Sequence, residues 1–342
     1  MKKLWILALG ALPLPALAAV TVTQPAANLS LESPFLLVAS TTDCSGAPIV
    51  SMGYSFDSQS NTTTFDVSSL NVEASYSGLT LGASHTLHVK SWASGGANCT
   101  TNVAFTAVAN PATTLPGGTV TVPEIQSNPD FTWAATDDSG TTGSASGTTQ
   151  LETSPSLSGD SRLTSTTYSG GGGERYDTSF GSDTTSESFL YDNWVYISSS
   201  STSKGLINLE MDMNQVTANG QTVIYGFQCD GNHGVWDYTE NSGTASAYHD
   251  TWVHSTQACP IPYNWLTNTW HHVQVTYERD GSGNVTYQSV WLDGSQQNIN
   301  ETVFSSFALG WGSVLLTNFQ IDGSTSSGEI EAYFDELAVS RW

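Results

Sequence analysis

The sequence predicts an all-β protein made of two β-sandwich domains. Serine, threonine, glycine, valine and tyrosine are abundant, whereas the helix-forming residues lysine, arginine and glutamate are few. Strand-like segments bounded by turn residues recur about every 8 to 12 residues, as in β-sandwiches. The chain of 342 residues is longer than a typical single domain. Together these observations favour two β domains over one domain or a helical fold.

The first 18 residues predict export. Lys2 and Lys3 precede an apolar run at 4–14, and Ala16-Leu17-Ala18 fits the small-x-small rule of signal peptidase. The run is too short to span a bilayer, and the rest of the sequence contains no membrane-length apolar stretch. We therefore expect a bacterial-type signal peptide at 1–18, a mature chain that begins near Ala19, and a secreted or cell-surface location.

The net charge of the chain limits the classes of partner that it is expected to bind. The formal net charge is −23 at pH 7. Such a chain repels nucleic acid and anionic membranes, whereas a neutral polymer meets no such penalty. We expect no nucleic-acid partner, and a monomer.

Four cysteines agree with two domains in an oxidising compartment. Cys44 and Cys99 lie in the first hundred residues, and Cys229 and Cys259 lie in the second half. One disulfide per domain is the simplest pairing, although four cysteines formally allow three pairings.

The first domain is predicted at residues 19–108. Strand-like runs at 35–39, 63–67 and 86–92 alternate with turn residues. The stretch 82–92, followed by Gly95-Gly96 and the run 103–108, resembles the last two strands of bacterial immunoglobulin-like domains. The resemblance implies a spacer or adhesion module. A linker is expected at 109–130, where Pro111 to Gly118 combines proline with glycine.

The second domain is predicted at residues 131–342, with a length and number of strands that suit a jelly roll of two packed sheets. The expected strands lie at 187–197, 206–213, 221–229, 234–238, 270–278, 285–292, 314–321 and 331–339.

Three motifs in this domain carry a second resemblance. The stretch 269–277, the glycine turn at 281–284 with the strand 289–294, and the closing strand 332–339 resemble the concanavalin A-like and laminin G-like superfamily. The resemblance implies a concanavalin A-like jelly roll. It does not imply one activity, since the fold serves lectins, glycosidases, lyases and adhesion modules.

The segment from Asn208 to Gln215 is the strongest candidate for a site. Period-two alternation places Leu209, Met211 and Met213 on one face of a strand. The other face then carries carboxyl and amide groups. Burying two carboxyl groups about 7 Å apart would raise the pKa of one of them. The residues of this polar face are Asn208, Glu210, Asp212 and Asn214.

The same run resembles the E-x-D core of retaining endoglucanases of the concanavalin A-like fold. This resemblance implies Glu210 as nucleophile, with Asp212 beside it, in an endo-acting glycoside hydrolase. The expected acid/base position is occupied by Asn214 or Gln215, and an amide cannot deliver a proton. A hydrolase would need its second carboxyl group from elsewhere, with Glu187 or Glu240 nearest in sequence.

Lectins of this fold use an E-x-D strand to bind a metal ion together with a nearby loop. Asp230, Asn232 and His233 lie in such a loop but depart from the lectin spacing. We expect no required cofactor, with a structural Ca²⁺ or a Mn²⁺ ion as the alternative.

Aromatic residues complete the candidate site, because a tryptophan ring packs on the apolar face of a pyranose. Trp236 and Tyr238 share one face of the strand that follows Gly234, and Trp252 lies between Cys229 and Cys259. These three residues are the predicted sugar platform.

The sequence thus predicts a secreted carbohydrate-binding protein that binds a neutral polysaccharide on the concave face of its jelly roll. One alternative is the glycoside hydrolase that uses Glu210. The other is a cell-surface adhesion or scaffold protein that binds protein partners.

Overall fold

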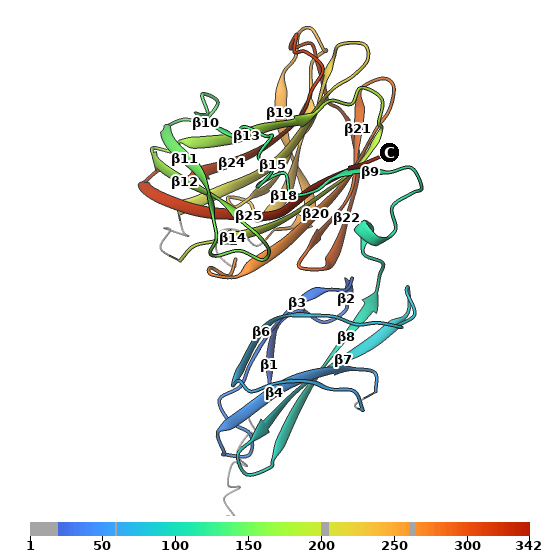
Figure 1. The fold of residues 1–342 in the computed structure, drawn as a ribbon, viewed down its shortest axis with the longest axis vertical. Helices are drawn as coiled ribbons and strands as arrows, with labels where there is room; N and C mark the ends of the chain where they lie inside the picture. The colour runs from blue at the N-terminus through green and yellow to red at the C-terminus, as the bar shows by residue number, and fades with distance from the viewer. Residues whose placement is uncertain (1–19, 59, 200–204, 260–264) are drawn as a thin grey trace, which may run out of the picture. The chain divides into compact units, whose positions relative to one another are not determined.

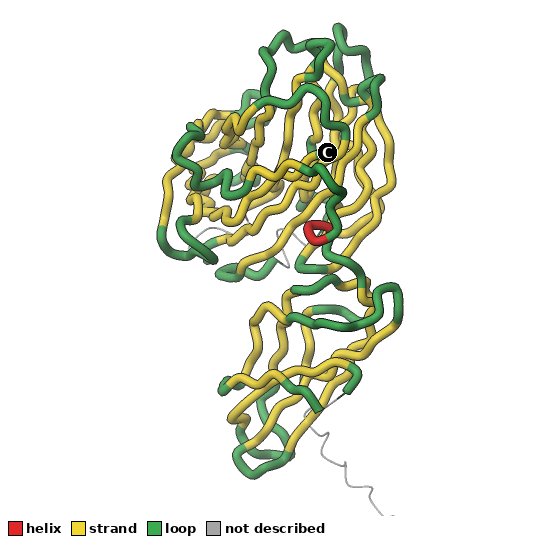
Figure 2. Tube along the Cα trace, turned by 45° about the vertical axis from the view of Figure 1, so that its right-hand side comes forward, coloured by secondary structure: helices red, strands yellow, loops and turns green. Residues whose placement is uncertain are grey.

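The computed structural model describes residues 20–58, 60–199, 205–259 and 265–342. Strands dominate the described residues (Figures 1 and 2), which confirms the prediction of an all-β fold. A 3₁₀ turn, η1 (Pro111–Thr113), lies within these ranges. No helix in the described ranges is long and apolar enough to cross a membrane. The predicted signal peptide at 1–18 lies outside the described residues.

The chain divides into two compact units. Unit 1 comprises the chain up to Leu29 together with Leu36–Ala107, and unit 2 comprises Ser30–Phe35 together with Val108–Trp342. Unit 1 is therefore interrupted by a short segment, unlike the continuous domain expected at 19–108. Within unit 2, Leu31 pairs with Ser295, and the Glu32 N–H donates to the Gly294 carbonyl at 2.8 Å.

Unit 1 contains two sheets with an apolar interior. One sheet has the order β1-β3-β6 and the other β8-β7-β4-β5. Leu37, Tyr54 and Phe105 are among its buried side chains. The predicted disulfide Cys44–Cys99 is present. The strand bounds are β1 (Thr21–Gln24), β3 (Phe35–Ser40), β4 (Ile49–Phe56), β5 (Thr63–Phe65), β6 (Ser69–Ala74), β7 (Ser84–Ala93) and β8 (Asn98–Ala107).

Unit 2 is built from two large antiparallel sheets. We call the first the outer sheet, with the order β11-β12-β25-β14-β20-β21-β22. Its strands are β11 (Ser144–Glu152), β12 (Ser161–Ser169), β14 (Ser188–Ile197), β20 (Trp270–Arg279), β21 (Asn284–Leu292), β22 (Ser295–Phe304) and β25 (Ser327–Arg341); β2 (Leu29–Leu31) pairs with β22.

Part of the predicted linker is built into this unit. The short strand β9 (Val120–Val122) pairs with β25, and the Ile125 side chain is fully buried in the core. Residues 120–125 thus belong to the sandwich, because their apolar side chains have a sheet surface to cover.

We call the second sheet of unit 2 the cleft sheet, with the order β10-β13-β24-β15-β17-β18-β19. Its strands are β10 (Ala134–Asp137), β13 (Gly173–Gly181), β15 (Leu206–Val216), β17 (Phe227–Asp230), β18 (Val235–Asn241), β19 (Asp250–Ala258) and β24 (Leu315–Gly323), with β16 (Thr222–Tyr225) and β23 (Ser306–Phe307) beside them.

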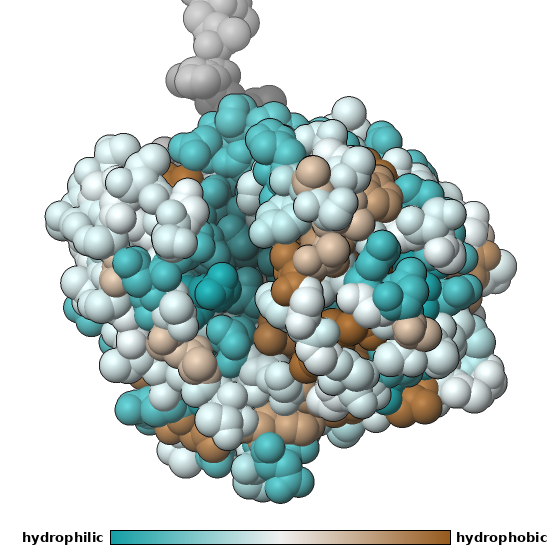
Figure 3. Space-filling view, turned by 90° about the horizontal axis from the view of Figure 1, so that it is seen from above, coloured by the Kyte–Doolittle hydropathy of each residue, from teal (hydrophilic) through white to brown (hydrophobic). Residues whose placement is uncertain are grey.

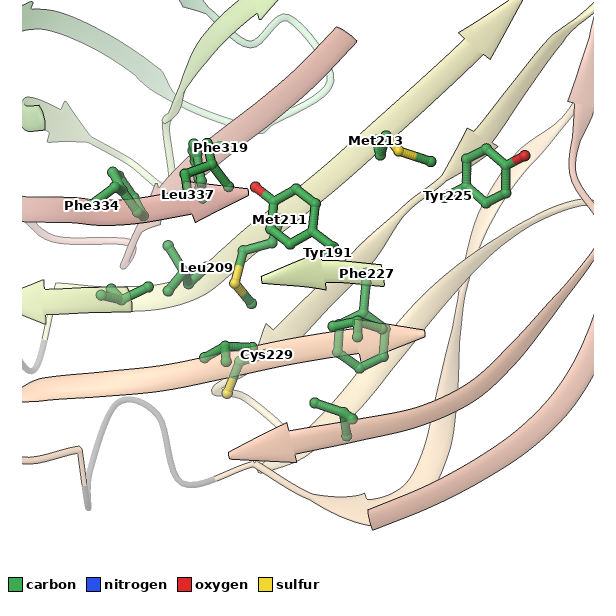
Figure 4. Close-up of a cluster of buried hydrophobic side chains, with 14 of the residues drawn as sticks. Tyr191, Leu209, Met211, Met213, Tyr225, Phe227, Cys229, Phe319, Phe334 and Leu337 are labelled. Atoms are coloured by element: carbon green, nitrogen blue, oxygen red, sulfur yellow. The ribbon is translucent and has the colours of Figure 1, made fainter. Parts of the chain in front are cut away.

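The core of unit 2 lies between these two sheets. Leu209, Met211 and Met213 of β15 point into a cluster of buried side chains (Figure 4). The ring of Phe319 on the cleft sheet stacks on Phe334 of the outer sheet, with centroids 3.8 Å apart. One face of the cleft sheet is thereby buried, and its other face is left for polar residues.

A glycine interrupts the strand that was expected at 221–229. Gly226 separates β16 from β17, and a Cβ atom at this position would lie 2.5 Å from the Thr239 side chain. Farther along, the predicted disulfide Cys229–Cys259 ties β17 to the chain that follows β19. These two features fix the edge of the cleft sheet that carries β17, β18 and β19.

Candidate functional site

The exposed face of the cleft sheet contains a cleft of about 710 Å³. A hollow with a hydrophilic interior and hydrophobic residues along one side is visible in Figure 3. The four polar residues predicted on β15 all line the cleft, and Leu209, Met211 and Met213 face the core. The alternation of apolar and polar residues in the sequence therefore predicted correctly which face of β15 is turned to the core and which to the cleft.

Neighbouring strands extend the polar face of β15. In register, Glu210 lies opposite Gln320 of β24, which lies opposite Arg175 of β13. One step along, Asp212 lies opposite Asn318, which lies opposite Asp177. Residues paired in this way point to the same side of an antiparallel sheet. The floor of the cleft is therefore a two-dimensional array of carboxyl and amide groups.

Sequence reasoning missed most of this array. The acids Asp138, Asp250 and Asp322 also line the cleft. The sequence of β24 could have predicted part of the array, because Asn318, Gln320 and Asp322 alternate with buried apolar residues as the polar residues of β15 do. Arg175 is the sole basic residue among the cleft-lining residues that the structure describes.

Burial raises the pKa values of several carboxyl groups in the cleft. It raises the pKa of Glu210 well above the usual value, and the negative charges of Asp212 and Asp322 raise it further. Burial also raises the pKa of Asp212 to about 7 and that of Asp322 to about 6. The pKa values of Asp177 and Asp250 are raised by the same cause. The raised pKa favours the neutral carboxylic acid form of Glu210, which can donate a hydrogen bond.

Specific donors hold Asp212 in place. Its Oδ1 accepts from the Phe227 backbone N–H at 3.1 Å, and its Oδ2 lies 3.5 Å from Asn318 Nδ2. The Phe227 N–H follows the break at Gly226, so the interruption between β16 and β17 directs a backbone donor at this carboxyl group.

Asp322 depends on a glycine opposite it. Its Oδ2 accepts from Asn208 Nδ2 at 3.2 Å, and its Oδ1 accepts from Gln320 Nε2 at 2.9 Å. A Cβ atom at position 173 would lie 2.0 Å from Asp322 Oδ1. Only glycine at position 173 leaves room for this carboxyl group in its present position.

Aromatic rings line the cleft, but two of the three predicted ones are not among them. Trp252 of β19 lines the cleft. Trp236 and Tyr238 lie on the core face instead, where Trp236 is fully buried and stacks on Phe227 with centroids 5.0 Å apart. The prediction that Trp236 and Tyr238 contact a sugar is wrong, because their side of β18 faces the outer sheet and Asp237 and Thr239 occupy the other side.

Two loop residues also place aromatic rings in the cleft. Tyr248 and Trp311 line the cleft and are 51% and 42% exposed, which is high for large aromatic side chains in a folded protein. Their loops are joined, since the Ala308 N–H donates to the Ala245 carbonyl at 2.7 Å. Strand periodicity could not find them because they lie outside strands.

Neither of the two glutamates suggested as the second carboxyl group of a hydrolase lies in the cleft. Glu187 and Glu240 are not among the cleft-lining residues that the structure describes. Glu187 forms an ion pair with Arg279 at 3.7 Å. Glu240 shares the face of β18 opposite to Thr239, which does line the cleft.

The loop at 230–233 forms a separate cluster with β19. Asp230 and His233 lie with His254, and their ligand atoms all lie within 4.8 Å of one another. Among the described residues, the potential metal-ligating group consists of Asp230, His233 and His254, and it includes neither Glu210 nor Asp212. Asn232 contributes its backbone N–H to Asp230 at 2.7 Å. The structure therefore does not bring the E-x-D residues and the loop together as one group of metal ligands.

Comparisons with known proteins find solved structures at low sequence identity and low TM-score. No family model matches the chain, and no curated protein sequence matches it. Arcelin-5, a lectin-like defence protein from Phaseolus vulgaris, is 11% identical with a TM-score of 0.33, over 66% of this chain and 98% of that one. An endo-1,3-β-glucanase from Streptomyces sioyaensis is 9% identical with a TM-score of 0.34, over 66% and 98%.

A family 11 carbohydrate-binding module from Clostridium thermocellum, in complex with a β-1,3-1,4-mixed-linked tetrasaccharide, is 11% identical with a TM-score of 0.26, over 60% of this chain and 87% of that one.

Proposed function

We propose that unit 2 binds a neutral polysaccharide in the cleft, and that the protein does so outside the cytoplasm. The observation that carries the proposal is the pairing of a polar floor with the exposed rings of Tyr248 and Trp311 in one cleft. Its volume of about 710 Å³ falls within the range of small-ligand sites, roughly 300 to 1,000 Å³. Two disulfides agree with an oxidising compartment.

Each part of the cleft has a counterpart in a sugar chain. Hydroxyl groups can donate to Asp212 and accept from Glu210 in the protonated form that its raised pKa favours, while Asn318 and Gln320 can both donate and accept. The apolar faces of the sugar rings can pack on Trp252, Tyr248 and Trp311. Directed hydrogen bonds supply selectivity, and the rings supply much of the affinity.

The charge of the cleft favours neutral ligands. Carboxyl groups outnumber the single guanidinium of Arg175, and that group already lies 3.9 Å from Asp177. A uronate polymer would bring further negative charge beside these acids without enough cations to balance it. Polygalacturonate and alginate are therefore expected not to bind.

A glycan array, run beside a reducing-sugar assay on neutral polysaccharides, tests the proposal. We expect wild-type protein to bind at least one neutral glycan, and the Trp252→Ala variant to bind it more weakly by about 1 to 3 kcal/mol. Trp270→Ala is the control, because Trp270 lies on β20 of the outer sheet, away from the cleft. Binding to uronates alone, or equal loss in both variants, would contradict the proposal.

Glycoside hydrolysis is the second candidate, favoured by the cluster of carboxyl groups with raised pKa values in one cleft. The raised pKa of Glu210 suits a proton donor rather than the nucleophile expected from sequence. Release of new reducing ends by wild type, abolished in Glu210→Gln, would establish this activity. Binding without release is the result that our first proposal predicts.

A further inference from the structure

A cluster of two histidines and two aspartates lies on the cleft sheet beside the cleft. In register, Glu210 of β15 lies opposite Gln228 of β17, Gln228 opposite Asp237 of β18, and Asp237 opposite His254 of β19. These side chains therefore share the polar face of the sheet. None of the two histidines and two aspartates is needed for the glycan site described above.

Three of the four side chains, those of Asp230, His233 and His254, have ligand atoms within 4.8 Å of one another, and Asp237 contacts the third of them. His233 Nδ1 lies 2.5 Å from Asp230 Oδ2, and His254 Nδ1 lies 3.7 Å from the same oxygen. His254 Nδ1 also lies 2.9 Å from Asp237 Oδ1. The two imidazole rings have centroids 4.1 Å apart. The two imidazoles and the Asp230 carboxylate thus offer three ligand atoms close enough together to reach one ion, and Asp237 orients the His254 ring through a hydrogen bond.

Each aspartate has one oxygen held by the protein and one that faces the histidines. Asp230 Oδ1 accepts from the backbone N–H groups of Asn232 at 2.7 Å and His233 at 3.4 Å. Asp237 Oδ2 accepts from Gln228 Nε2 at 3.3 Å. A metal-binding carboxylate is oriented in the same way, with its second oxygen hydrogen-bonded.

The backbone around the cluster is tied down. The disulfide Cys229–Cys259 joins the residue before Asp230 to the end of the segment that carries His254. Gly234, with φ of 71°, turns the loop so that its N–H donates to the Asp230 carbonyl at 2.8 Å. Both carboxylates are buried, whereas the His233 and His254 side chains are 59% and 49% exposed. A metal ion could therefore enter from solvent and retain an open coordination position.

We propose that Asp230, His233 and His254 bind one divalent transition-metal ion of the zinc type, with Asp237 hydrogen-bonded to His254 as the residue that orients this ring. Imidazole nitrogen is a ligand that zinc, copper and nickel favour, whereas Ca²⁺ takes oxygen ligands. The proposal is thus a different site from the Ca²⁺ or Mn²⁺ site expected with the E-x-D strand. It does not rest on the proposed glycan-binding function.

A simple histidine–aspartate hydrogen bond is the competing explanation, and unit 1 provides an example of one. His85 Nδ1 lies 2.7 Å from Asp57 Oδ2. In the cluster, each imidazole has its own aspartate partner, and the two rings also converge, with centroids 4.1 Å apart and His254 Nδ1 3.7 Å from the oxygen that His233 contacts, which two separate hydrogen bonds do not require. A shared ion accounts for both rings at once.

The test is calorimetric titration of ZnCl₂ into the full chain without a histidine tag. We expect one site per chain, and loss of affinity of about 100-fold or more in His233→Ala and in His254→Ala. Gln228→Ala removes only the donor to Asp237 and should weaken zinc binding about 10- to 100-fold. His85→Ala is the matched control and should bind zinc as wild type does.

Absence of saturable zinc binding in the wild type would overturn the proposal. So would unchanged binding in the His233→Ala/His254→Ala double variant, provided that circular dichroism shows it folded. Saturable Ca²⁺ binding that depends on Glu210, with no zinc binding at the histidines, would assign the metal to the E-x-D strand instead. Glycan affinity measured on the same variants separates failure of this proposal from failure of the glycan site.

Discussion

Replacing Asp212 by asparagine should stabilise the folded protein at alkaline pH and have little effect in acid. The Asp212 side chain is 8% exposed, and burial raises its pKa from 3.8 to about 7. Asparagine has nearly the same shape, and its carbonyl oxygen can still accept from the Phe227 N–H. The substitution therefore removes the charge and leaves the packing in place.

The sign and the size follow from proton linkage. Because the pKa is higher in the folded state, the folded protein retains a proton that the unfolded chain loses as pH rises above 3.8. The free energy of unfolding then falls until the pH passes about 7. At 1.36 kcal/mol per pH unit, the difference corresponds to roughly 4 kcal/mol. This is an upper limit, since Glu210 and Asp212 titrate as a pair.

Urea denaturation at pH 4 and at pH 8 measures the effect. We expect Asp212→Asn to raise the free energy of unfolding at pH 8 by up to roughly 4 kcal/mol, and to change it little at pH 4. Asp130→Asn, at an exposed position of unit 2, is the control and should show no such difference between the two pH values. An equal effect of Asp212→Asn at both pH values, or destabilisation at pH 8, would refute the reasoning.

Three further predictions concern the framework of the cleft. Trp236→Ala should lower the free energy of unfolding by about 3 to 5 kcal/mol, because this side chain is fully buried, with glycan affinity per folded molecule preserved in a titration. Gly173→Ala should displace the Asp322 carboxyl group and weaken glycan binding; a crystal structure with Asp322 unmoved would contradict this. Replacing Cys229 and Cys259 together by serine should cost about 2 to 5 kcal/mol of stability and weaken zinc binding, as measured by denaturation and calorimetry.

Sequence periodicity predicted which face of β15 is buried, whereas the buried face of β18 was assigned to the ligand although the same pattern was present. On β15 the two faces differ sharply, so the apolar face could be assigned to the core. On β18 the same rule applies, because Asp237 and Thr239 alternate with Trp236 and Tyr238. The expected affinity of tryptophan for sugars outweighed this pattern, although buried aromatic residues are the more general case.

Other parts of the cleft could not be found from one sequence. Tyr248 and Trp311 lie in loops, where no periodicity fixes the direction of a side chain. The histidine cluster depends on the register between β18 and β19, which brings His254 opposite Asp237 across 17 residues of sequence. Register of this kind is set by long-range pairing and not by local pattern.

Isothermal titration of a soluble neutral polysaccharide into wild type and into the Trp252→Ala/Trp311→Ala double variant tests the central claim most directly. The cleft account predicts saturable binding by wild type. It also predicts an unchanged unfolding midpoint in the variant and a loss of at least about 2 kcal/mol of binding free energy, since each ring contributes about 1 to 3 kcal/mol. Equal affinity of the two folded proteins for the polysaccharide would contradict it.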